Sequence, residues 1–115
     1  MSNSYGIPPE IEKKIRNDDK KCVYCHKKMK KFSRVGKRSD MATVEHFREK
    51  GPFYWKEGLK EEDVGICCCS CNSSRGILKL SDWFGKSYCA DRAKPINEDT
   101  VAKKVRYFIL RTSKK

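Results

Sequence analysis

The chain has 115 residues, of which 37% are apolar and 37% are charged, and its formal net charge at pH 7 is +12. This length and composition fit one small domain over residues 1–115, with a core so thin that it needs a staple such as a metal. No stretch approaches the ~20 apolar residues of a membrane helix, and no apolar leader follows Met1, so we expect a cytoplasmic protein outside the membrane.

Cysteine content and charge narrow the class further. Seven cysteines without a signal peptide favour a reducing compartment, where C-x-x-C pairs are metal or redox sites rather than disulfides. The 27 Lys and Arg residues against 15 Asp and Glu indicate a polyanionic partner, and nucleic acid is the expected one. The alternative is a solvated lysine surface that aids solubility.

The first predicted element is a short helix that opens at Pro8-Pro9 and ends at turn-forming residues 17–19. Cys22-x-x-Cys25 follows, with the bite that a tetrahedral zinc accepts, although redox motifs share this spacing. His26 is a weaker alternative ligand. Residues 27–40 are dense in Lys and Arg, and we expect a solvated hairpin tip or an edge that contacts phosphates.

A strand is predicted from Met41 to Phe47, with Glu45 and His46 near its far end. Consecutive strand residues point to opposite faces, so both side chains reach one site only if the strand ends or bulges there. Residues 48–63 are predicted to form a loop. Its aromatic cluster, 53–55, is expected to cover the core, with stacking on an unpaired base as the alternative.

A second strand, 64–67, leads into the second knuckle. Four cysteines fall between 67 and 71, which leaves the ligand register open in principle; the pair Cys68 and Cys71 repeats the 22/25 spacing and is our choice. The remaining cysteines, Cys67, Cys69 and Cys89, are then small buried hydrophobes.

Three helical segments are predicted after the knuckle. The first has its start in residues 72–76 or already within the knuckle, and either stops near Gly76 or resumes beyond it. The second is a short helix capped by Ser81-Asp82 that carries core residues Trp83 and Phe84. The third is a C-terminal docking helix at about 98–111, capped by Asn97, whose apolar residues recur at i, i+4, i+7 and i+8.

Together the two knuckles predict a four-cysteine structural zinc that ties the ends of a hairpin, with ligands Cys22, Cys25, Cys68 and Cys71. Beside them, Glu45 and Asn72 offer hard oxygen atoms that suit Mg²⁺ or Mn²⁺, and His46 offers a base. Arg75 lies about one helical turn beyond Asn72 and is placed to meet a phosphate oxygen. These residues are the minimum set for metal-assisted hydrolysis of a phosphodiester.

The order Cys22-x-x-Cys25, Glu45-His46, Cys68-x-x-Cys71-Asn72 and Arg75-Gly76 resembles the HNH, or ββα-metal, endonuclease family over residues 22–76. The resemblance implies an α+β fold: a small, treble-clef-like ββα-metal core stapled by zinc, with flanking N- and C-terminal helices. It also implies DNA nicking or cutting, with His46 as the general base, Glu45 and Asn72 on the catalytic ion, and the four cysteines on zinc.

The sequence departs from the family pattern at three positions. Glu45 stands where the family usually has Asp, and Arg75 stands where Lys is common. Asp63 is the nearest match to the middle Asn, which steadies the loop behind the catalytic His, but a carboxylate lacks the amide's NH2 donors. By its position, Asp63 is nevertheless the residue that we expect to orient this loop.

The sequence thus predicts a metal-dependent DNA endonuclease that contacts the backbone. One small domain leaves little room for a sequence reader, so we expect low specificity, structure-selective cleavage or help from a protein partner, and a homodimer would allow double-strand cuts. The alternatives are a non-catalytic zinc module that binds nucleic acid or protein, and a thiol oxidoreductase with one exposed C-x-x-C.

Overall fold

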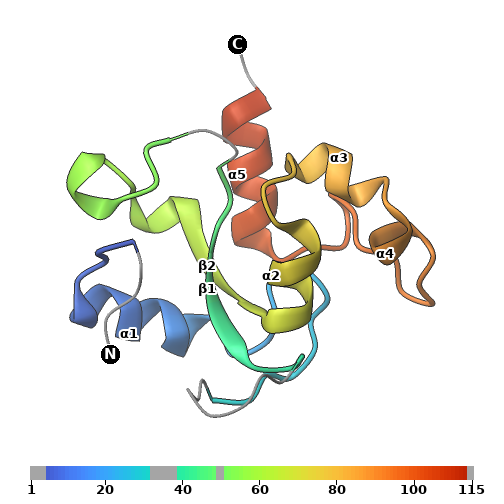
Figure 1. Ribbon diagram of the computed structural model, residues 1–115, viewed down its shortest axis with the longest axis horizontal. Helices are drawn as coiled ribbons and strands as arrows, with labels where there is room; N and C mark the ends of the chain where they lie inside the picture. Colours follow the sequence, from blue (N-terminus) through green and yellow to red (C-terminus); the bar gives the residue numbers. More distant parts are fainter. Residues whose placement is uncertain (1–4, 32–38, 49–50, 114–115) are drawn as a thin grey trace.

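The computed structural model describes residues 5–31, 39–48 and 51–113. At its centre is an antiparallel hairpin of β1 (Ala42–His46) and β2 (Val64–Cys68), in which Val44 pairs with Ile66 and His46 with Val64 (Figure 1). The predicted two-stranded sheet in a mixed α/β chain is confirmed. Residues 32–38, which hold most of the predicted basic hairpin tip, lie outside the described residues.

Helix α1 (Pro9–Asp18) covers one face of this hairpin (Figure 1). The predicted start of the helix at the prolines and its predicted end at residues 17–19 are confirmed. Ile15 packs with Ile66, Val64 and Leu59 in a buried cluster, because strand residues two apart share a face. The predicted aromatic cover is only partly present: Trp55 packs against this cluster, whereas Tyr54 is exposed.

The opposite face of the hairpin packs against α2 (Cys69–Arg75) and α5 (Lys103–Ser113) (Figure 1). A larger buried cluster there contains Tyr24, Phe47, Trp83 and Phe108. It also contains three of the knuckle cysteines, and the fourth, Cys25, packs against it. Helix α2 begins within the second knuckle and ends at Gly76, which has a left-handed φ of 54°. The hairpin therefore separates two apolar clusters, and β2 contributes to both.

Two short helices follow, α3 (Leu80–Phe84) and α4 (Ser87–Ala90). The prediction that Ser81-Asp82 cap the first of them is wrong, because α3 already begins at Leu80, with Lys79 at the capping position. Leu80 is buried in the large cluster, so its packing starts the helix earlier than the cap chemistry alone indicates.

The C-terminal helix begins later than predicted. Asn97 caps only an isolated turn, in which its side-chain oxygen accepts from the Asp99 N–H and its carbonyl from the Thr100 N–H. The Ala102 N–H donates to the carbonyl of Val23 at 2.8 Å. Because this N–H is then not available for an intrahelical hydrogen bond, the helix does not run continuously from residue 98. The predicted apolar face is confirmed, since Val105 and Phe108 are buried.

The long connection between the strands is less irregular than the predicted loop. It contains two 3₁₀ turns, Trp55–Glu57 and Glu61–Asp63, and the second leads directly into β2. Within the described residues, no helix combines the length and apolar character that a membrane crossing demands.

Candidate functional site

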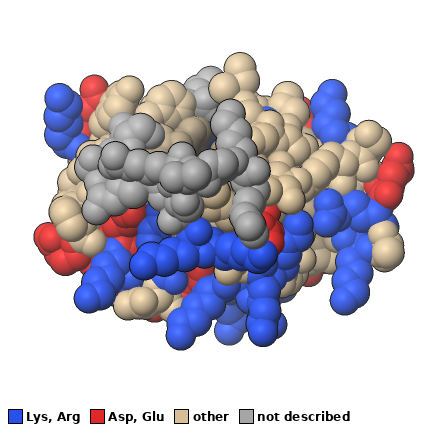
Figure 2. Space-filling view, turned by 60° about the horizontal axis from the view of Figure 1, so that its bottom comes forward, with Lys and Arg blue, Asp and Glu red and all other residues tan. Residues whose placement is uncertain are grey.

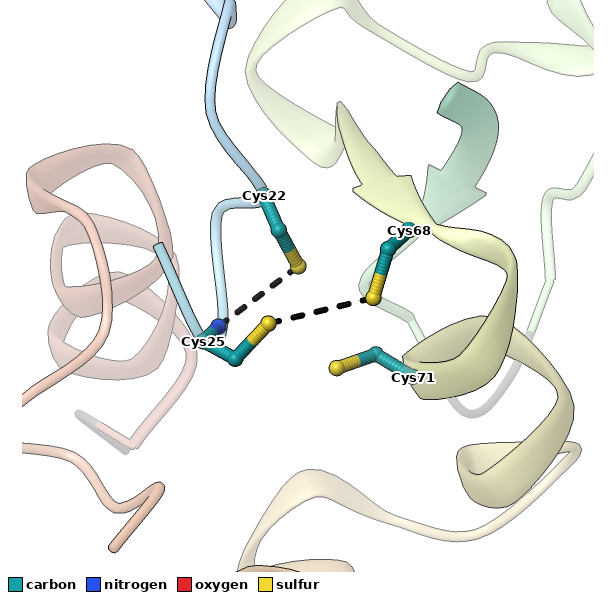
Figure 3. Close-up of side chains that lie close together, drawn as sticks. All are labelled: Cys22, Cys25, Cys68 and Cys71. Atoms are coloured by element: carbon teal, nitrogen blue, oxygen red, sulfur yellow. Dashed lines mark hydrogen bonds between the residues drawn. The ribbon is translucent and has the colours of Figure 1, made fainter. Parts of the chain in front are cut away.

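The four knuckle cysteines converge on one point between the Cys22–Cys25 turn and the start of α2 (Figure 3). Their Sγ atoms all lie within 4.8 Å of one another, and those of Cys25 and Cys68 are 3.8 Å apart. Zinc bound tetrahedrally by sulfur at about 2.3 Å requires sulfurs about 3.8 Å apart, so the spacing fits this ion. The chain thus has a four-cysteine cluster compatible with zinc.

The sulfurs of this cluster lie close to hydrogen-bond donors and to one another. The backbone N–H groups of Tyr24 and Cys25 point at Cys22 Sγ from 3.4 and 3.5 Å, and Tyr88 Oη lies 3.4 Å from Cys71 Sγ. Hydrogen bonds among the four thiols lower the pKa of Cys25 and Cys68 and raise the pKa of Cys22 and Cys71. Sulfurs this close carry four negative charges only beside a cation.

The structure resolves the ligand register that the sequence left open. Cys68 and Cys71 join the cluster, while Cys67 and Cys89 are buried apart from it and Cys69 is part-exposed near Ser73. His26 is not a ligand: its ring donates to the carbonyl of Thr100. The backbone of His26 has a left-handed φ of 62°, which closes the first knuckle.

Glu45 points into the large cluster and forms a buried ion pair with Arg75. Its Oε2 accepts from Arg75 Nη1 at 3.0 Å and from the Tyr24 hydroxyl at 2.8 Å. The exposed fractions of the Glu45 and Arg75 side chains are 3% and 1%. Burial raises the pKa of Glu45, and the positive charge of Arg75 opposes this shift.

The expected contact between Arg75 and a phosphate is not what the structure shows. The guanidinium is enclosed and donates to the carbonyls of His46, Phe47 and Leu78 at 2.6, 2.8 and 2.9 Å. Arg75 therefore fixes the backbone at and after the end of β1, a positioning role that sequence reasoning missed. Its spacing in the sequence was the available signal. Arg75 lies four residues after Cys71, so both side chains are on the same, inward side of α2.

His46 lies at the end of β1 on the face opposite Glu45, which strand alternation requires. Its Nδ1 lies 2.9 Å from the carbonyl of Arg48, so this nitrogen carries the proton and Nε2 is the acceptor. The ring packs against Tyr5 and Phe53, with centroids 5.4 and 4.9 Å away. Burial lowers the pKa of His46, which keeps the imidazole neutral at pH 7.

Asn72 is tied to β1 through its side-chain NH2, which donates to Thr43 Oγ1 at 2.9 Å and to the Val44 carbonyl at 3.3 Å. The amide oxygen accepts no hydrogen bond from the described residues. Neither does Glu45 Oε1, which belongs to a side chain that is only 3% exposed. Thr43 and Glu45 share a face of β1, so Glu45 and Asn72 lie on the same side.

Asp63 does not orient the loop after His46 through its side chain within the described residues. One carboxylate oxygen accepts from the Lys60 N–H at 3.2 Å, and the other lies 3.4 Å from Arg111. It is the backbone carbonyl of Asp63 that accepts from the Phe47 N–H, at 2.8 Å. The expected loop-orienting side chain is thus a cap of a 3₁₀ turn.

The structure therefore brings the four cysteines together and places Glu45 and Asn72 on one side of β1, with His46 at the strand end on the other. Comparison of the chain with protein families, with curated proteins and with solved structures finds no match.

Proposed function

We propose that the chain is a metal-dependent DNA endonuclease of the HNH type, with a treble-clef-like zinc core and His46 as the general base. The observation that carries this proposal is the hydrogen bond between His46 Nδ1 and the carbonyl of Arg48 at 2.9 Å, which leaves Nε2 as a proton acceptor. The ring of His26 bonds a backbone carbonyl in the same way, but only His46 lies at the end of β1, next to Glu45.

The oxygen donors around β1 fit a hard divalent ion. Glu45 Oε1 and the amide oxygen of Asn72 would hold Mg²⁺ or Mn²⁺, which commonly binds through one or two side chains and completes its shell with water and phosphate. Such an ion would polarise the phosphate and stabilise the leaving oxygen. The four-cysteine zinc would be structural, because all four of its positions are filled by protein sulfur.

Because β1 ends at His46, a phosphate lying across the strand end would meet both faces, and His46 would accept a proton at Nε2 from the water that attacks phosphorus. Arg75 would hold the carbonyl of His46 and thereby fix the direction of the ring, while Tyr24 and Arg75 would keep Glu45 ionised by hydrogen bonds to Oε2. Nothing in this set reads base sequence, so we expect cleavage with low specificity unless a protein partner or a homodimer supplies it.

The test is nicking of supercoiled plasmid by the wild type and by His46→Ala, with Mg²⁺, with Mn²⁺ and without added ion, at verified zinc content. The chain's other histidine gives a matched control, since the ring of His26 bonds to the Thr100 carbonyl, outside β1. We expect His46→Ala to lose at least about a hundredfold in rate and His26→Ala to cut normally. Equal cutting by both variants would remove His46 from its role.

One observation favours the second candidate, a zinc module that binds DNA without cutting it. The ion pair with Arg75 already gives Glu45 a structural role. A module that only binds DNA needs no further role for this carboxylate. In that case the zinc-loaded wild type would bind DNA, never cut it with either ion, and keep its affinity in His46→Ala.

A further inference from the structure

A groove of about 780 Å³ runs between α1 and the chain that leads into β1, away from the four-cysteine cluster. We call it the α1 groove. Five basic residues line it against two acidic ones: Lys13, Arg16, Lys20, Lys30 and Lys31 against Glu12 and Asp19. Figure 2 shows Lys and Arg side chains gathered across the lower side of the molecule in Figure 1.

Both acidic residues of the groove are already neutralised. Glu12 pairs with Arg16 at 2.8 Å. Asp19 accepts from Lys104 at 2.7 Å and from the Ile66 N–H at 3.1 Å. Their charges therefore do not repel an incoming anion.

Three of the basic residues remain available. Lys13, Lys20 and Lys31 are exposed, and none of them makes an ion pair within the described residues. Lysine charges gathered around one groove repel one another until a polyanion relieves them. The exposed cations and the neutralised acids together form a surface for a chain of phosphates.

The groove opens on the same face of the hairpin as His46. Ala42 lines the groove, and Ala42, Val44 and His46 alternate onto the α1 side of β1. Four residues at about 3.3 Å each place Ala42 about 13 Å from His46. That length corresponds to roughly four base-pair steps of 3.4 Å along a DNA duplex.

We propose that the α1 groove binds the phosphate backbone of double-stranded DNA about four base pairs from the phosphate at His46. This inference rests on the proposed nuclease function and deepens it, because it assigns the substrate's backbone a second site beyond the residues of the reaction. The groove contacts phosphates and adds affinity without sequence specificity.

The experiment compares two triple variants that remove the same charge. Lys13→Gln/Lys20→Gln/Lys31→Gln empties the groove of its unpaired cations. Lys86→Gln/Lys94→Gln/Lys103→Gln removes three exposed lysines that do not line it. The binding of a fluorescent 20-base-pair duplex is measured by anisotropy from 50 to 300 mM salt without added divalent ion, after zinc content and far-UV circular dichroism are matched.

Each phosphate contact contributes about 0.9 to the steepness of the slope of log K against log[salt]. With three contacts removed, the slope of the groove variant should be shallower by roughly 2.7, and its affinity for the duplex should fall by at least about tenfold. The control should keep the wild-type slope. Equal losses in both variants would overturn the proposal, since binding would then follow net charge alone. Absence of wild-type binding, or a groove effect seen only with an RNA duplex of the same sequence, would also overturn it.

This outcome is separable from that of the nuclease proposal. If the wild type nicks plasmid and the two triple variants bind DNA alike, the groove proposal fails and the nuclease proposal stands. If the groove variant alone loses affinity but the wild type never nicks, the groove binds DNA in a protein that does not cut it.

Discussion

At the residue scale, the most tightly held side chain near the candidate site is Arg75. Its guanidinium donates to three backbone carbonyls and to Glu45 while the residue is 1% exposed. Desolvating a buried ion pair is costly, and the attraction between its charges offsets this cost only when the remaining donors also form hydrogen bonds, as they do here. The pair therefore specifies where β1 ends rather than adding much net stability.

Removing one partner of the pair should be severe. We expect Arg75→Met to lower the free energy of unfolding by about 3–5 kcal/mol, because it leaves the Glu45 carboxylate buried without a counter-charge. Urea unfolding at fixed free zinc measures the loss, and Arg106→Met, an exposed arginine of α5, is the matched control with little change. The double variant Glu45→Gln/Arg75→Met should regain a large part; a single-variant loss below about 1 kcal/mol would contradict the account.

Residue-level prediction from the sequence succeeded where spacing alone fixes the geometry. The four cysteines repeat one local turn, and the structure brings their sulfurs within 4.8 Å. It failed for Arg75 and Asp63, whose partners are 30 and 48 positions away in the chain. No local pattern reveals such partners. The roles of His46, Glu45 and Asn72 in catalysis stay predictions.

At the scale of elements, the hairpin is packed from both sides at Gly65. A Cβ at this position would lie 2.8 Å from the Phe47 ring and 3.2 Å from both Asp19 Oδ2 and Lys104 Cδ. Gly65 thus allows α1, β2 and α5 to meet at one point, where Asp19 also joins Lys104 at 2.7 Å.

A methyl group at this point should overpack the contact. We expect Gly65→Ala to lower the free energy of unfolding by about 1–3 kcal/mol, because the Phe47 ring is buried and has little space to move. Gly85→Ala is the control, since its new Cβ would meet only a backbone oxygen, at 3.6 Å. Thermal unfolding of both variants checks the difference. Equal melting temperatures of the two variants would contradict the prediction and would mean that the three elements can move apart at Gly65 at little cost.

The elements themselves were predictable where the sequence carried local signals. Pro9 and the 17–19 turn bound α1, as expected, and α2 ends before Gly76, which is one of the two outcomes that the sequence left open. The start of α5 was not predictable, because it depends on the Ala102 N–H, which bonds to Val23 in a segment 79 residues earlier in the chain. Tertiary contacts of this kind override a cap signal such as Asn97.

At the scale of the whole molecule, the hairpin joins the two buried apolar clusters. Ile66 belongs to the α1 cluster, and the neighbouring Cys67 and Cys68 belong to the larger one. The four-cysteine site lies within the larger cluster and ties residues 22–25 to the start of α2. A metal bound there stabilises the larger cluster directly and the α1 cluster through β2.

We expect the four-cysteine cluster to hold zinc, and loss of that ion to unfold the chain as one unit. Zinc binding in small domains is worth about 10–16 kcal/mol, whereas whole domains are stable by only about 5–15 kcal/mol. We expect a chelator to abolish the far-UV helix signal at 25 °C and added zinc to restore it. Cys68→Ser should behave as the chelated protein does, while Cys69→Ser, one residue on and outside the cluster, should keep one zinc per chain. A folded Cys68→Ser variant with full zinc content would exclude this ligand set, and a partial loss of helix on chelation would show that α1 and its cluster fold without the metal.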